Sequence, residues 1–83
     1  MENGEIMNEK ETLLKEINKW LPKCREEMKK IKKVKDKEFL ENTRAYISDT
    51  EHFLQKGDLV RAFEAIVWAW AWLEIGQRKK ILE

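Results

Sequence analysis

The feature that most constrains the fold is the run Ala65–Leu73, nine residues without a charge in a chain that is 40% charged. The run is too short to cross a bilayer as a helix, which takes about 20 apolar residues. Glutamates bracket it, and alanines within and beside it favour helix over strand. Gly57 and Asp58, just upstream, are typical of a helix end followed by a new N-cap. The sequence therefore predicts a helix that begins after Asp58.

Helical periodicity divides this predicted helix into two apolar faces. At about 100° per residue, the core face carries Leu59, Ala62, Phe63, Ile66, Ala69, Trp70 and Leu73. Trp68 and Trp72 lie outside that face and form a second apolar ridge. The polar residues expected around this ridge are Arg61, Glu64 and Lys79. Two interpretations of the ridge stay open: burial against the first helix, or a surface for a protein partner or a second copy of the chain.

The first predicted helix spans roughly residues 8–34. Its apolar stripe recurs at steps of three and four residues, and Asn8 with Glu11 is a capping-box pair. Pro22 removes one backbone hydrogen bond, but the apolar phase continues through it, which predicts a kink and not a loop. Residues 1–7 are expected to be a frayed tail. The stripe consists of Leu13, Ile17, Trp20, Cys24, Met28 and Ile31, with Val34 also expected to turn inward.

The second predicted helix follows an N-cap at Asp36 and ends at Gly57. The short turn at Gly57 and Asp58 predicts an antiparallel hairpin of the second and third helices. No segment has the alternating pattern of a strand. The expected fold class is therefore all-α, a three-helix bundle forming one domain over residues 1–83. The inner stripe of the second helix is Phe39, Thr43, Tyr46, Thr50 and Phe53.

The net charge is only +1, but residues 23–37 carry eight basic and three acidic side chains. This basic segment predicts an alternative role, contact with nucleic-acid phosphates. Two observations favour a structural explanation: cations stabilise a helix C-terminus, and the lysine run holds no arginine or aromatic side chain that would stack on bases. The lysines concerned are Lys29, Lys30, Lys32, Lys33, Lys35 and Lys37.

Little in the sequence points to catalysis. Asp49 and His52 share a helical face, but there is no second histidine, so a solvated face is expected. Cys24 is expected to act as a small buried hydrophobe. The isolated glycines form no phosphate-binding loop. We therefore expect no catalytic residue, no metal and no cofactor. Glu74 and Arg78, four residues apart, are expected to form a surface ion pair.

The N-terminal residues are acidic and lack an apolar segment of the kind found in secretion signals. No stretch is expected to insert into a membrane. A cytoplasmic protein is the resulting expectation.

One further pattern spans the second half of the chain. It consists of Tyr46, Asp49, Phe53, Gly57, Asp58, Ala62, Ala69, Trp72, Leu73, Gly76 and Arg78. By this pattern, residues 39–78 resemble the archaeal Domain of Unknown Function 357 family. The resemblance implies a small helical protein and carries no established activity. Departures from the family pattern include Trp68 where the family has Tyr and Ile75 where it has Ala.

The sequence thus predicts a non-enzymatic interaction or self-association module that uses the tryptophan ridge. The alternative is a nucleic-acid accessory protein that uses the basic segment.

Overall fold

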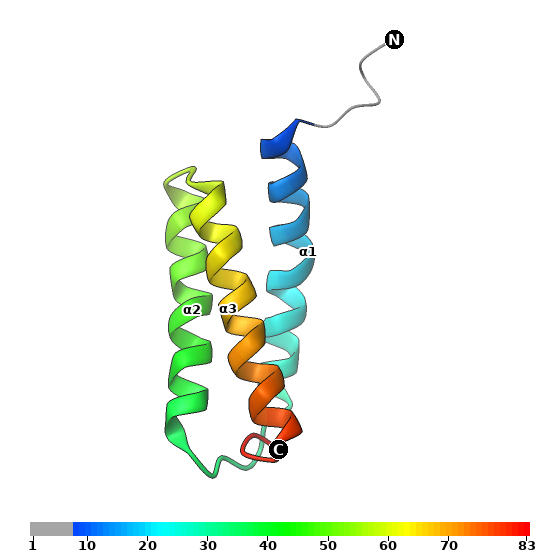
Figure 1. Ribbon diagram of the computed structural model, residues 1–83, viewed down its shortest axis with the longest axis vertical. Helices are drawn as coiled ribbons and strands as arrows, with labels where there is room; N and C mark the ends of the chain where they lie inside the picture. Colours follow the sequence, from blue (N-terminus) through cyan, green and yellow to red (C-terminus); the bar gives the residue numbers. More distant parts are fainter. Residues whose placement is uncertain (1–7) are drawn as a thin grey trace.

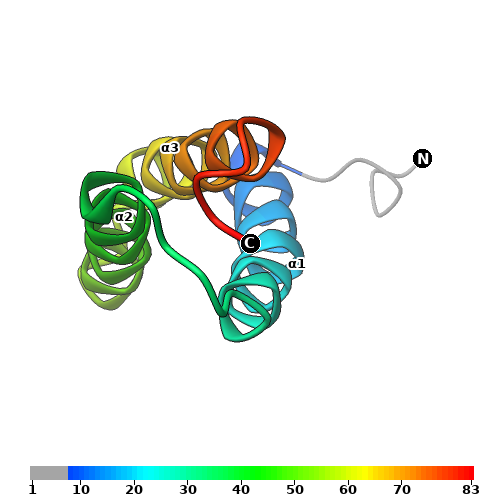
Figure 2. The same cartoon turned by 90° about the horizontal axis from the view of Figure 1, so that it is seen from below.

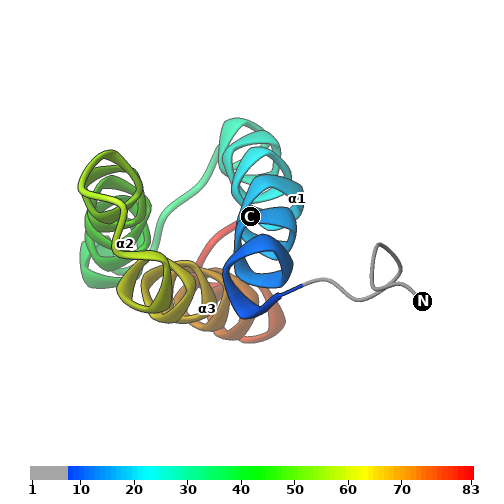
Figure 3. The same cartoon turned by 90° about the horizontal axis from the view of Figure 1, so that it is seen from above.

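The computed structural model describes residues 8–83, which form three α-helices: α1 (Glu9–Lys29), α2 (Lys37–Gln55) and α3 (Leu59–Arg78). In Figure 1 the helices run down, up and down, and α3 packs against both of the others. Views along the bundle show α3 between α2 and α1, which touch each other little (Figures 2 and 3). The predicted all-α bundle with an α2–α3 hairpin is confirmed. The tail predicted over residues 1–7 lies outside the described residues.

The predicted helix starts are confirmed by hydrogen bonds. Asn8 Oδ1 accepts from the Glu11 amide at 2.8 Å, and Glu11 Oε1 accepts from the Asn8 amide at 3.2 Å, which completes the capping box. Asp36 and Asp58 cap α2 and α3 through their side-chain oxygens. Gly57 has a φ of +74°, the left-handed conformation expected at the end of α2.

Pro22 lies inside α1, and the helix continues through it as predicted.

The core is built from residues of all three helices, and α3 contributes alanines together with the large Ile66 and Leu73. The fully buried hydroxyls of Thr43 and Thr50 on α2 donate to the carbonyl oxygens one turn earlier, Phe39 and Tyr46, at 2.7 Å each. Because these hydroxyls are satisfied within their own helix, the two threonines behave as small apolar residues. The buried apolar residues are Ile17, Leu21, Cys24, Ala62, Ala65, Ile66, Ala69, Leu73 and Leu82.

The first helix is shorter than predicted. It ends at Lys29, and residues 31–35 are extended and paired with residues 81–83. Lys35 N donates to Ile81 O, and Glu83 N donates to Lys33 O, both at 2.8 Å. These long-range bonds satisfy backbone groups that a longer helix would have satisfied locally, so the prediction of helix up to residue 34 is wrong. Val34, expected to point inward, is exposed.

The segment after α3 folds back over the end of that helix. Ile81 N and Leu82 N both donate to Gly76 O, at 2.8 and 3.1 Å, and Lys80 adopts a positive φ of 58°. The Leu82 side chain is thereby buried. A Cβ on Gly76 would lie 2.7 Å from Leu82 Cδ1 and 3.3 Å from Phe39 Cδ2. Glycine at position 76 is therefore what allows Leu82 to pack.

We predict that Gly76→Ala lowers the free energy of unfolding by about 1–3 kcal/mol, the usual effect of overpacking. Urea denaturation monitored by circular dichroism measures it. The same change made in a Leu82→Ala background should cost less, because the obstructing side chain is gone. An equal cost in both backgrounds would show that contact with Leu82 is not the reason.

Candidate interaction surface

The outward side of α3 carries several exposed apolar side chains, with the exposed Glu64 between Val60 and Val67. Val60, Val67, Trp68 and Ile75 are 60, 50, 55 and 47% exposed, and Ala71 lies among them. We call these five residues the outer face of α3. Among residues 8–83, it holds four of the six exposed large hydrophobic side chains. Single exposed apolar residues are normal on a protein surface, whereas several on one side of a helix make that side a candidate interaction surface.

The packing of the other tryptophans explains why this stripe stays exposed. The partly buried Trp70 lies at the α1 side, with its ring edge-on to Trp20 at 5.8 Å, and its Nε1 donates to Trp20 O at 3.1 Å. Trp72 lies at the α2 side, edge-on to Phe39 at 5.0 Å. The two flanks of α3 are thus filled by aromatic contacts, and neither α1 nor α2 covers the side between them.

The ridge predicted from Trp68 and Trp72 contacts α2, not α1. Trp68 stacks on Tyr46 with a centroid distance of 6.1 Å and an interplanar angle of 22°. One face of the Trp68 indole is therefore supported, while more than half of the residue remains exposed. Of the two interpretations left open by the sequence, burial of the ridge against α1 therefore does not hold. Sequence reasoning also missed Val60, Val67 and Ile75, although their steps of seven and eight residues are helical.

Two hollows adjoin Trp68. The smaller, about 220 Å³, has an entirely apolar exposed lining of Phe39, Trp68, Ala71, Trp72 and Ile75. The larger, about 580 Å³, extends along the α2 side towards Tyr46, Asp49, Arg61 and Glu64. A partner side chain placed beside Trp68 would therefore meet apolar surface first and polar groups further out.

The charged residues predicted around the ridge occupy three different settings. Arg61 Nη1 pairs with Asp58 Oδ2 at 3.0 Å, and Glu64 is exposed beside the outer face. Lys79 is exposed and forms the C-cap of α3. Within residues 8–83, no ion pair joins Glu74 to Arg78, so the predicted surface pair is wrong.

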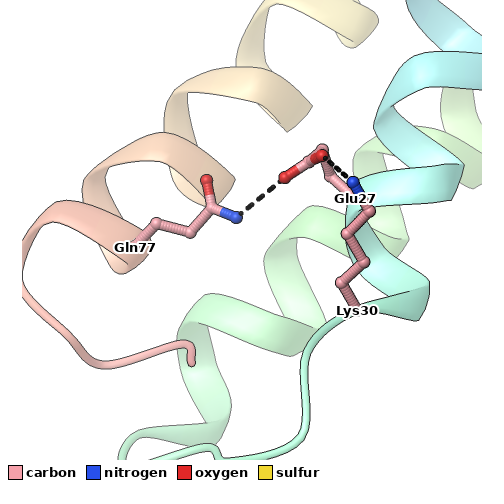
Figure 4. A network of polar contacts seen from close by, with 3 residues as sticks. All are labelled: Glu27, Lys30 and Gln77. Carbon is pink, nitrogen blue, oxygen red and sulfur yellow. Dashed lines mark hydrogen bonds and ion pairs between the residues drawn. The ribbon is translucent and has the colours of Figure 1, made fainter.

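A polar link ties the lower ends of α1 and α3 (Figure 4). Glu27 accepts a hydrogen bond from Lys30 Nζ at 3.0 Å and another from Gln77 Nε2 at 3.3 Å. The bond from Lys30 is the main cause of a lowered pKa at Glu27, and the bond from Gln77 adds to it. The pKa of Glu27 is lower in the folded chain than the ordinary pKa of a glutamate. The link therefore stabilises the fold at pH values above that ordinary pKa, and this stabilisation is lost as the pH falls through the lowered pKa of Glu27.

The predicted basic segment does not lie on one helix. Lys29 and Lys30 end α1 and pair with Glu26 and Glu27 at 3.3 and 3.0 Å. Lys32, Lys33 and Lys35 belong to the extended segment, and Lys37 begins α2. The pairing with residues 81–83 brings Lys79 and Lys80 to the same end of the bundle. We call this surface the basic end; its second half was missed because only a long-range contact creates it.

The remaining candidates have structural surroundings. Burial raises the pKa of the Cys24 thiol to about 11, so the thiol stays protonated at neutral pH and unreactive. His52 is exposed and lies edge-on to Phe53 at 5.4 Å. Across residues 8–83, no three His, Cys, Asp or Glu side chains gather closely enough to hold a metal ion. None of the three helices is both long and apolar enough to cross a bilayer.

These observations define a small all-α domain in which a central third helix presents an apolar outward face. A family model described as "Protein of unknown function (DUF357)" matches residues 10–82, and the chain belongs to this family. The resemblance predicted over residues 39–78 is thus confirmed and extends into α1. The crystal structure of a DUF357 protein from Archaeoglobus fulgidus is similar, with a TM-score of 0.85 and 51% identity over 92% of this chain and 97% of that one. No curated protein matches the chain significantly.

We predict different costs for two tryptophan truncations. Trp70→Ala should lower the free energy of unfolding by about 3 kcal/mol, because it removes the contact with Trp20 and a hydrogen bond. Trp68→Ala should cost about 1 kcal/mol, since it loses mainly one stacking contact. Urea denaturation measures both values. Iodide should quench the wild-type fluorescence more than that of Trp68→Ala. Equal destabilisation by the two changes would show that Trp68 is ordinary core.

Proposed function

We propose that this chain is a non-enzymatic interaction module that binds a protein partner through the outer face of α3. The observation that carries the proposal is the exposure of four large apolar side chains, Val60, Val67, Trp68 and Ile75, on one side of one helix. Because this side of α3 faces away from both α1 and α2, it can receive a partner without rearrangement of the core.

Binding would remove apolar surface from water, with Trp68 as the central anchor. Tryptophan is enriched among residues whose truncation costs most at interfaces. Tyr46 supports one face of the Trp68 ring, so little side-chain freedom would be lost on binding. Arg61, Glu64 and Lys79 would form the polar rim.

Retention of partners by the immobilised chain tests this proposal. Trp68→Ala combined with Ile75→Ala should abolish retention of a partner, whether a different protein or a second copy, while circular dichroism shows an intact fold. Leu14→Ala is the matched control, because Leu14 is a similarly exposed apolar residue, 41%, on α1. Unchanged retention by the double variant would contradict the proposal.

A second candidate function is phosphate contact with nucleic acid at the basic end. The pairing that brings Lys79 and Lys80 beside Lys32, Lys33 and Lys35 supports it, since a cluster is a better phosphate site than a linear run. A structural role also accounts for the cluster. The carbonyl ends of α1 and α3 both lie there, and lysines stabilise such ends.

The second candidate predicts binding of duplex or single-stranded nucleic acid at about 0.15 M salt, with an affinity that falls as the salt concentration rises. Lys32→Gln, Lys33→Gln and Lys80→Gln together should weaken that affinity. Lys10→Gln, Lys15→Gln and Lys56→Gln remove the same charge elsewhere and should not. Fluorescence anisotropy measures both. No binding by the wild type, or equal losses in the two triple variants, would exclude this candidate.

A further inference from the structure

Two opposite charges, Glu64 and Arg78, lie on the outward side of α3 at equal distances from Ala71. Glu64 and Arg78 lie seven residues before and seven residues after Ala71, and both are exposed. Fourteen residues make about four helical turns, so the two charges lie on the same side of α3. They are about 21 Å apart along the helix, too far to pair with each other. Within residues 8–83, neither takes part in an ion pair.

This arrangement is complementary to itself when a second α3 runs in the opposite direction. A two-fold axis at Ala71 places each residue opposite the one equally far on the other side of Ala71. Glu64 then faces Arg78 of the second copy, and the same contact occurs twice. A parallel arrangement would instead place Glu64 against Glu64 and Arg78 against Arg78. The charges therefore favour the antiparallel direction.

The aromatic surface fits the same arrangement. Trp68 of the second copy would lie level with Glu74, on the side of α3 that carries Trp72 and Ile75. That position adjoins the apolar hollow of about 220 Å³ between Trp68 and Ile75. The two-fold axis makes this contact reciprocal, so each hollow receives one indole. Ala71 at the centre is small enough for a close approach of the two helices, at about 8–10 Å.

We propose that the partner of the outer face of α3 is a second copy of this chain, held antiparallel about Ala71. This inference rests on the proposed function and names its partner. Trp68 enters the apolar hollow of the other copy, and two Glu64–Arg78 pairs fix the direction and register. The outer face of α3, exposed in one copy, becomes the centre of the interface.

A charge exchange tests the pairing by sedimentation equilibrium. The wild type should have twice the mass of one chain. Glu64→Arg alone should raise the dissociation constant about tenfold, because it creates two like-charge contacts. Adding Arg78→Glu should restore the wild-type constant. Since positions 64 and 78 are too far apart to pair within one chain, such a rescue reports a contact between copies.

Trp68→Ala should raise the dissociation constant of the two copies about a hundredfold, because both copies lose the anchoring side chain. Leu14→Ala should leave it unchanged. Circular dichroism and urea denaturation show whether each variant is folded.

A wild-type chain that is monomeric at about 1 mM would overturn the self-association. So would a Glu64→Arg variant that associates normally, or a charge exchange that restores nothing. If the wild type is monomeric but Trp68→Ala still abolishes binding of a different protein, the proposed function stands and only the second copy is excluded. If neither kind of binding responds to Trp68→Ala, both proposals fail.

Discussion

Close packing of α2 against α3 is the contact on which the rest of the structure depends. Four of the six buried residues of α3 are small, Ala62, Ala65, Ala69 and Gly76, and α2 contributes the two buried threonines. Small side chains let two helices approach closely, but they leave no room for an indole between the helices. The tryptophans of α3 are therefore displaced to its flanks and its outward side.

The position of α1 follows from that displacement. Trp70 projects from the flank of α3 opposite α2 and meets Trp20, whose carbonyl oxygen satisfies the indole N–H. The α1 helix closes the core there with Ile17, Leu21 and Cys24. It touches α2 little, and an ion pair between Arg25 and Glu51 joins these two helices. Both neighbours thus leave the outward side of α3 uncovered, which is why the candidate surface lies on the central helix.

Local sequence patterns predict the elements of this fold well. The three N-caps and the left-handed Gly57 depend on interactions within a few residues, and each is confirmed. The predicted stripes contain most of the buried residues, although Val34 is exposed. The end of α1 was mispredicted because Lys35 and Lys33 bond residues almost fifty positions away. Periodicity likewise places Trp68 off the core, but it does not fix the handedness of the bundle, which decides on which flank of α3 each other helix lies. That Trp68 neighbours α2 therefore follows only from the structure.

Arg78 connects the two proposed surfaces. It lies at the last turn of α3, on the same side as Glu64, and it directly precedes Lys79 and Lys80 of the basic end. In the antiparallel pair its charge would be neutralised by Glu64 of the second copy, which lowers the positive potential at the basic end. An anion bound at the basic end would compete with Glu64 of the second copy for the Arg78 guanidinium. Since coupling between two binding events is reciprocal, self-association and phosphate binding would oppose each other through this one side chain.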